Sequence, residues 1–533
     1  MNRQPAIVLA AGALVAVIPL LLFGYSWKQY DFIFHFTAWQ EYGQAMANGN
    51  LLPIWSDLAN FGLGEPRYLF YPPLSMMLGG LLSWLLPPAL LPGAMIWLLT
   101  WLCALTTWRL TPASLDHRRR LVVALLPALG FGMLNSGLVR YAMAEMMACA
   151  LIPLLLSCFI GMRSAPGPLS VIRFAAIAAL MWLTNMPMSI ASAYLLGAVA
   201  LYCCLREGSP KLMLHYLVGY ALSVLAVAWY LIPAMLAESH ISPSAVGPEG
   251  FSSMTLLDIP SLIGRNMVAL VISAVALVIF LLALSLRRRQ LDQRLETVAV
   301  AGVVAIALQL PGMVWLFDKL PMTAMVGFWF RFYFFVSLAL PVVAFCLFRS
   351  RWLYAFIGLA YAVFYAGVGL LILQLSHQEG ADTDLYAPTA EVLQRHAEGF
   401  IGYPEYLNSA TDARVISQSS QRPDWTVTAP AGCTGEVIGQ QRATLQVATH
   451  GEQACTHTLA RYAFPWWQLR IDGQPVAHGH DERGLLTVEV PPGEHRLSAS
   501  VERPLGATLL GWGISLVTVL GAGVVLWRTR RTR

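Results

Sequence analysis

Long apolar segments recur along the whole chain and alternate with short polar loops. A helix needs about twenty apolar residues to cross a hydrocarbon layer of ~30 Å, and these segments are of that order. Arginine-rich loops such as Arg118–Arg120 and Arg287–Arg289 belong in the cytoplasm by the positive-inside rule. Assigning the apolar segments between such loops as membrane crossings predicts twelve of them, with both termini cytoplasmic: 6–26, 91–110, 121–137, 141–162, 174–185, 187–205, 212–234, 267–286, 296–316, 328–348, 352–375 and 506–527.

The apolar run from Pro72 to Leu86 is not counted as a crossing. A crossing there would place Arg118–Arg120 outside, against the charge rule. The run also begins and ends at proline pairs. We therefore expect a juxtamembrane or half-inserted helix in a first external loop over residues 28–90.

That loop opens with an amphipathic pattern between Phe32 and Asn48. Apolar residues lie on one side of the expected helix, and polar residues lie on the other: Thr37, Gln40, Glu41, Gln44 and Asn48. This pattern is typical of a helix in the membrane interface. Asp31 begins the helix, and His35 follows four residues later, so we expect their side chains to share one edge.

From Ser376 to Leu505 the period changes to short alternating segments, such as Leu486–Val490, with turn signals such as Asp472-Gly473 between them. More than half of the chain's 29 acidic residues fall in this stretch. We expect a transmembrane core over residues 1–375, a small extracytoplasmic β-sandwich over 376–505, and a last helix with a basic cytoplasmic tail over 506–533. The fold class is thus a polytopic α-helical membrane protein with about twelve transmembrane helices and a β-rich external domain.

Composition supports this class, since 57% of the residues are hydrophobic and only 12% are charged, which excludes a soluble enzyme. The net charge of +5 is modest and lies mostly in short loops, so nucleic acid is not an expected partner. Six of the eight cysteines lie in or beside expected crossings. Cys433 and Cys455 are the two in the external domain, and we expect a disulfide between them in an oxidising compartment.

Several short motifs follow the first crossing in a fixed order. They are Tyr30–His35 with its aspartate, Leu52-Pro53-Ile54-Trp55, Gly62-Leu63-Gly64-Glu65-Pro66 and Tyr71-Pro72-Pro73-Leu74. This set resembles the bacterial GT-C glycosyltransferases and, more narrowly, the YfhO-like group of membrane proteins. The segment Phe464–Trp467 before Asp472-Gly473 is similar to the C-terminal module of that group. The resemblance implies an enzyme that takes a sugar from a polyprenyl-phosphate carrier, with Asp31 as its catalytic carboxylate.

Such a transfer needs a base for the acceptor proton and positive charge for the leaving phosphate. The resemblance assigns the base to Asp31, and we expect His35 to support it, although a solvated acid at a helix start would look the same. Arg331 lies at the outer start of an apolar crossing, where an arginine costs a few kcal/mol without a partner. We expect it to bind the donor phosphate, with Arg67 as a second contact, although a snorkelling anchor would share this position.

Other polar residues are candidates for the lining of the cavity: Asp57, Glu65, Tyr71, Arg140 and Glu145. Arg140 and Glu145 fit a structural ion pair equally well. Either Asp57 or Glu65 could assist the reaction or bind a divalent metal. The sequence requires no cofactor, however, and has no zinc-ligand spacing.

We therefore expect an inverting glycosyltransferase in a bacterial inner membrane, with its active site facing the periplasm. Its partners would be the bilayer, a polyprenyl-phosphate-linked sugar and an extracytoplasmic acceptor, which could be an envelope glycan, a lipid or a protein. A transporter or flippase shares the twelve-helix plan. A non-catalytic component of an envelope polysaccharide pathway is a third interpretation. Only the enzyme needs a carboxylate at Asp31.

Overall fold

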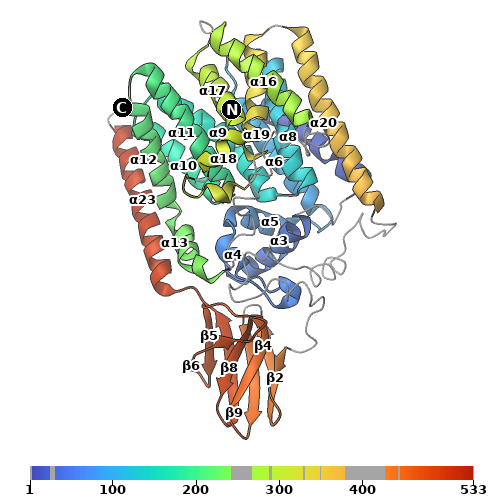
Figure 1. Ribbon diagram of the computed structural model, residues 1–533, viewed down its shortest axis with the longest axis vertical. Coiled ribbons are helices and arrows are strands. Elements are labelled where there is room, and N and C mark those ends of the chain that lie inside the picture. Colours follow the sequence, from blue (N-terminus) through green and yellow to red (C-terminus); the bar gives the residue numbers. More distant parts are fainter. Residues whose placement is uncertain are drawn as a thin grey trace.

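The computed structural model describes residues 3–24, 31–241, 267–286, 291–317, 319–327, 330–348, 350–378, 426–441 and 444–531. A bundle of helices forms one part of the molecule, and a β-domain projects from one end of it (Figure 1). The helices are α1 (Arg3–Ala13), α2 (Ile18–Phe23), α3 (Phe32–Ala47), α4 (Arg67–Phe70), α5 (Pro73–Leu85), α6 (Leu91–Leu110), α7 (His117–Ala128), α8 (Phe131–Leu134), α9 (Met143–Ser164), α10 (Pro168–Trp182), α11 (Met186–Glu207), α12 (Lys211–Ala226), α13 (Ala228–Ala237), α16 (Met267–Ser285), α17 (Gln293–Ala307), α18 (Val314–Phe317), α19 (Phe330–Leu347), α20 (Arg351–Gln378) and α23 (Leu505–Arg531).

Within the described residues, seven helical spans are long and apolar enough to cross a membrane, or eight if one bent pair is a single span. The seven are Gln4–Phe23, Leu91–Leu110, His117–Val139, Met143–Ser164, Met186–Glu207, Arg351–Gln374 and Leu505–Thr529. A helix lies at each of the twelve expected crossings, but several of these helices are too short for the same test, so the number twelve stays a prediction. Both chain ends lie in the half of the bundle away from the β-domain (Figure 1).

Two expected crossings are interrupted. The crossing expected at 296–316 is wrong in extent, because α17 ends at Ala307 and Pro311 begins a separate short turn. The crossing expected at 212–234 is bent by 73° between α12 and α13. A bend of this size removes hydrogen bonds between successive turns, and the exposed backbone groups need other partners.

The last helix supplies those partners. Ser515 of α23 accepts a hydrogen bond from the Trp229 N–H (3.1 Å) and donates one to the Leu225 carbonyl (3.2 Å), which lie on either side of the bend. Gly511 permits this approach, because a Cβ there would lie 2.8 Å from the Ala228 carbonyl oxygen. The helix that follows the β-domain therefore stabilises the broken span.

The helix α3 is more buried than its amphipathic pattern predicts. Most of its residues are buried on both sides, including Thr37 and Glu41 from the expected polar face. It packs against α5 at glycines, where a Cβ on Gly43 would lie 2.8 Å from the Gly80 carbonyl oxygen. The expected helix in the apolar run after Pro72 is present as α5. The prediction of an exposed polar face for α3 was wrong at Thr37 and Glu41, which are buried, whereas Gln44 and Asn48 are exposed.

The β-domain contains two antiparallel sheets, with strand orders β1-β4-β8-β7 and β2-β3-β9-β5-β6. The strands are β1 (Val427–Thr428), β2 (Cys433–Gln441), β3 (Thr444–Gly451), β4 (Cys455–Tyr462), β5 (Trp467–Ile471), β6 (Gln474–Val476), β7 (Gly479–His480), β8 (Leu485–Val490) and β9 (Gly493–Val501). The two-sheet architecture confirms the β-sandwich prediction, and the Cys433–Cys455 disulfide is present between strands of the two sheets. Most of the stretch from 376 to 425 lies outside the described residues.

The β-domain packs on the first external loop. The Trp55 ring lies 5.2 Å from the Trp467 ring, and both rings are buried in one apolar cluster with Leu63. The backbone N–H of Tyr462 donates to the Leu63 carbonyl at 3.0 Å. Arg461 also donates to the Gly62 carbonyl at 3.1 Å. The loop that lies between the bundle and the β-domain in Figure 1 is therefore held from the side of the β-domain.

We expect Ser515→Ala to lower the melting temperature of the detergent-solubilised protein. The variant removes one acceptor and one donor at the α12–α13 bend, and leaving a buried polar group without its partner costs about 1–3 kcal/mol. Thr518→Ala is the matched control, since Thr518 donates only within its own helix, to the Ile514 carbonyl. Equal melting temperatures for the two variants would show that Ser515 does not stabilise the bend.

Candidate functional site

Three charged side chains that are distant in the sequence form one buried ion cluster. Glu145 is 3% exposed and accepts a contact from Arg140 Nη1 on Oε1 at 2.6 Å. Arg331 Nε reaches the other oxygen, Oε2, at 3.0 Å. The Ser136 hydroxyl donates to Oε1 at 2.8 Å. We call Arg140, Glu145 and Arg331 the arginine–glutamate cluster.

The backbone beside this cluster departs from regular helix. Residues Asn135–Val139 form a π-helical turn, and Tyr141 has a φ of 58°, in the left-handed region that bulky residues rarely adopt. The Tyr141 ring is fully buried, 4.5 Å from the Phe32 ring. Both irregularities cost free energy and are concentrated at functional sites in proteins. They turn the chain so that Arg140 and Glu145 meet.

Asp31 lies against this turn. Its backbone N–H donates to the Arg140 carbonyl at 2.9 Å, and its own carbonyl accepts from the His35 N–H at 3.0 Å. Asp31 is the N-cap residue of α3, as its place at the start of the amphipathic pattern predicted. Its side chain is partly exposed. Asp31 therefore adjoins the arginine–glutamate cluster, and we treat them as one candidate site.

His35 and Tyr71 are in contact behind Asp31. His35 is fully buried, and burial lowers its pKa to about 3, with the charges of Arg67 and Arg140 adding to the effect. The imidazole is therefore neutral near pH 7, and its Nε2 lies 3.4 Å from the Tyr71 hydroxyl. Burial, followed by the negative charges of Asp31 and Glu145, raises the pKa of Tyr71. His35 can act here as a neutral hydrogen-bonding group.

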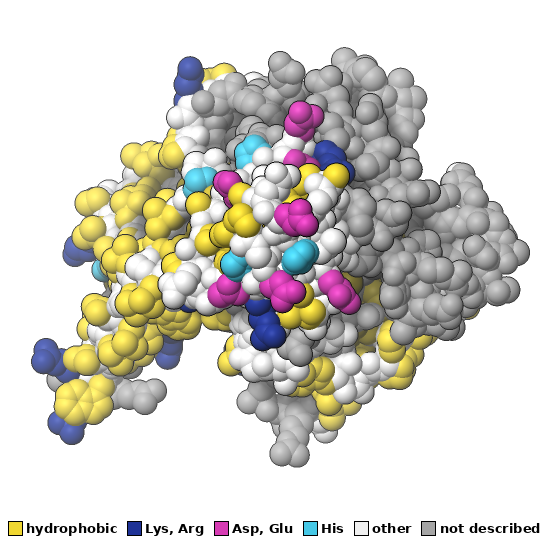
Figure 2. Space-filling view, turned by 90° about the horizontal axis from the view of Figure 1, so that it is seen from below, with side chains coloured by type: hydrophobic (Ala, Val, Ile, Leu, Met, Phe, Trp, Pro, Cys, Tyr) yellow, Lys and Arg dark blue, Asp and Glu magenta, His cyan; other side chains and the backbone are white. Residues whose placement is uncertain are grey.

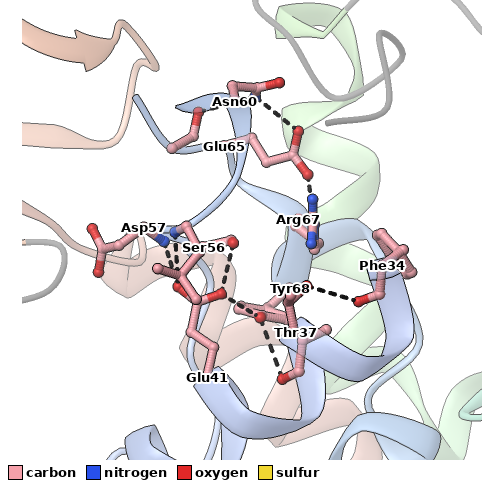
Figure 3. A network of polar contacts seen from close by, with 12 residues as sticks. Phe34, Thr37, Glu41, Ser56, Asp57, Asn60, Glu65, Arg67 and Tyr68 are labelled. Carbon is pink, nitrogen blue, oxygen red and sulfur yellow. Dashed lines mark hydrogen bonds and ion pairs between the residues drawn. The ribbon is translucent and has the colours of Figure 1, made fainter. Parts of the chain in front are cut away.

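Glu65 and Arg67 form a separate buried pair, with 2.6 Å between Arg67 Nε and Glu65 Oε1 (Figure 3). Asn60 donates to the second carboxylate oxygen at 3.1 Å, and the Arg67 guanidinium lies 4.4 Å from the centre of the Phe34 ring. Burial raises the pKa of Glu65, and the charge of Arg67 opposes this effect. A phosphate could contact the Nε of Arg67 only if this pair separated, which disfavours the expected phosphate role of Arg67.

Glu41 is the group that sequence reasoning missed. Its carboxylate accepts from the Ser56 hydroxyl at 2.7 Å, the Tyr68 hydroxyl at 2.7 Å and the backbone N–H groups of Asp57 (2.5 Å) and Leu58 (3.3 Å) (Figure 3). Asp57 thus approaches Glu41 through its backbone, while its side chain is only partly buried. The position of Glu41 on the polar side of the helix gave no signal of this role, because its partners come from a later loop.

None of the described residues forms a group of three or more His, Cys, Asp or Glu side chains that could hold a metal ion. The glycines of the first loop serve its tight turns. Gly62 and Gly64 have φ values of 84° and 81°, and a Cβ on Gly64 would lie 2.3 Å from the Trp55 indole nitrogen.

No family model matches the chain, and no curated protein matches it. Among solved structures, the chain is similar to the archaeal oligosaccharyltransferase AglB from Archaeoglobus fulgidus in complex with an inhibitory peptide and a dolichol-phosphate, with 12% identity and a TM-score of 0.38 over 75% of this chain and 56% of that chain. A second Archaeoglobus fulgidus oligosaccharyltransferase structure, in complex with Zn and sulfate, gives 13% identity and a TM-score of 0.36 over 75% and 57% of the two chains. The chain thus spans somewhat more than half the length of these solved structures.

We expect Glu41→Ala to loosen the first external loop. The change leaves two hydroxyls and two backbone N–H groups without their acceptor, which should cost about 3 kcal/mol or more in the free energy of unfolding. Limited proteolysis and thermal unfolding measure the effect. The exposed Gln44 on the same helix provides the matched control, Gln44→Ala. Unchanged cleavage of the loop in Glu41→Ala would contradict the role of Glu41 as its anchor.

Proposed function

We propose that this protein is a membrane glycosyltransferase that transfers a sugar from a polyprenyl-phosphate donor to an extracytoplasmic acceptor, with inversion at the anomeric carbon. The apolar helices favour a lipid-borne substrate. The motifs of the first external loop resemble GT-C enzymes, and more narrowly the YfhO-like group. The proposed location is the bacterial inner membrane, with both termini in the cytoplasm and the site facing the periplasm.

The observation that carries the proposal is the arginine–glutamate cluster beside Asp31. Two guanidinium groups share one carboxylate, so the cluster has a surplus positive charge. Guanidinium groups suit phosphate because their planar N–H donors bind its oxygens in pairs. The side chains of Arg140 and Arg331 are 17% and 10% exposed, so both reach the boundary of the buried cluster. In this proposal, Asp31 is the base and the adjoining arginine–glutamate cluster binds the phosphate.

The reaction can be assigned to these groups atom by atom. The acceptor hydroxyl oxygen attacks the anomeric carbon while Asp31 takes its proton. The bond between the anomeric carbon and the phosphate oxygen breaks, and its electron pair leaves with the lipid phosphate. Arg140 and Arg331 stabilise the negative charge that develops there. We assign Tyr71 the role of a hydrogen-bonding group beside the sugar, with the buried, neutral His35 supporting its hydroxyl.

We expect Asp31→Asn to lower sugar transfer about a hundredfold or more, the usual range for loss of a positioned base. The change preserves the size of the side chain and leaves the backbone bond to Arg140 intact, so folding should survive. The assay is transfer by purified protein from a polyprenyl-phosphate donor. Asp116→Asn is the control, since Asp116 is also a helix N-cap and lies at the start of α7. A mutant that matches an active wild type would place the base elsewhere.

We expect Arg331→Lys to lose at least tenfold in transfer with little loss of thermal stability. Lysine keeps a positive charge beside Glu145 but cannot reproduce the planar fork of donors. The exposed Arg351, at the start of α20, provides the control Arg351→Lys. Full activity of Arg331→Lys would reduce Arg331 to a structural partner of Glu145.

A further inference from the structure

The outer face of the five-stranded sheet holds a groove that the proposed reaction does not use. Its volume is about 470 Å³, and its lining residues come from β3, β9 and the β5–β6 turn: Gln446, Asp472, Gly473, Arg496 and Ser498. Strand register brings them together, because Gln446 of β3 and Arg470 of β5 both pair with Ser498. Every lining side chain is polar, and the groove is open to solvent.

Asp472 is held in place before any ligand arrives. It has a φ of 50°, and Gly473 has a φ of 84°, which together form a tight turn. One carboxylate oxygen accepts from the Arg496 backbone N–H at 2.8 Å, and the other lies 2.6 Å from His495 Nδ1. These hydrogen bonds lower the pKa of Asp472, with the His495 bond first. A fixed acceptor loses little conformational entropy on binding.

The composition of the groove selects among ligand classes. Asp472 and Arg496 carry opposite charges, and the exposed Arg470 lies beside Ser498 on the same sheet face. The amide of Gln446 and the hydroxyl of Ser498 both donate and accept. Acidic and histidine side chains gather on the end of the β-domain seen in Figure 2. The exposed acids of the domain include Glu452, Glu482 and Glu494. This surface disfavours an anionic polymer. The lining contains no aromatic or large apolar side chain, which disfavours a protein partner.

We propose that this groove is a binding site for a neutral saccharide chain. Alternating donors and acceptors on a flat sheet face fit vicinal hydroxyl groups. Because no aromatic ring is present to stack on a sugar, each sugar residue should bind weakly. A polymer of repeating units would gain apparent affinity, because each of its units can bind the groove in turn. The proposal that the bound saccharide is the acceptor of the reaction rests on the proposed function. The proposal that the groove binds a saccharide does not.

The test is saturation-transfer NMR on the full-length protein in nanodiscs. The probes are neutral oligosaccharides of four to eight residues built from glucose, galactose, mannose or N-acetylglucosamine, with heparin fragments as the anionic comparison. We expect signals from at least one neutral probe, and at least a tenfold weaker affinity for the double variant Gln446→Ala/Arg496→Ala. Thr444→Ala is the matched control, on the same sheet face and outside the groove.

Several outcomes would overturn the proposal. They are no signal from any neutral probe, equal affinity of the double variant and wild type, and tighter binding of heparin fragments than of all neutral probes. Asp31→Asn separates this site from the proposed reaction. If the variant loses transfer and keeps saccharide binding, both proposals stand. If wild type binds saccharide at the groove and shows no transfer, the binding site stands and the glycosyltransferase proposal fails.

Discussion

The buried carboxylate of Glu145 is the constraint on which the centre of the molecule depends. An ionised group in this environment is costly unless it is paired and hydrogen-bonded, and loss of one partner of a buried pair costs about 3–5 kcal/mol. Its partners come from the irregular turn before α9 and from the start of α19. The left-handed Tyr141 and the π-helical turn persist because this pairing requires the path they make. The same turn offers the Arg140 carbonyl to Asp31, so one ion cluster also fixes where α3 begins.

A second buried carboxylate fixes the rest of the first external loop. Glu41 of α3 accepts hydrogen bonds from the loop, and the β-domain contacts the same loop through Tyr462 and Trp467. The β-domain therefore helps to hold this loop in place and is not an independent appendage. The last helix extends this connection, since it leaves the β-domain and supports the α12–α13 bend with Ser515. From that bent span, Tyr230 donates to the Phe70 carbonyl at 2.5 Å, beside Tyr71.

Local sequence patterns could predict the features that depend on local physics. Hydropathy located the helices, alternation located the β-domain, and the compartment argument paired Cys433 with Cys455. The spacing of Arg140 and Glu145 suggested their ion pair. The partner of Arg331 could not be predicted, because 186 residues separate it from Glu145 and no periodicity encodes that contact. For the same reason Glu41 was misread as solvated, since an amphipathic pattern does not say what covers the polar face.

The rigidity of the site bears on the choice between enzyme and transporter. A transporter must expose its binding site to each side of the membrane in turn, so the helices around that site must move against one another. Here α3 is fixed at its start to the arginine–glutamate cluster and along its length by Glu41 and α5. The adjoining loop is also fixed by the β-domain. Any movement that separated α3 from these partners would break several buried contacts together, at a cost of many kcal/mol. Under the proposed function, the two guanidinium groups that Glu145 orients would need little reorganisation as charge develops on the leaving phosphate.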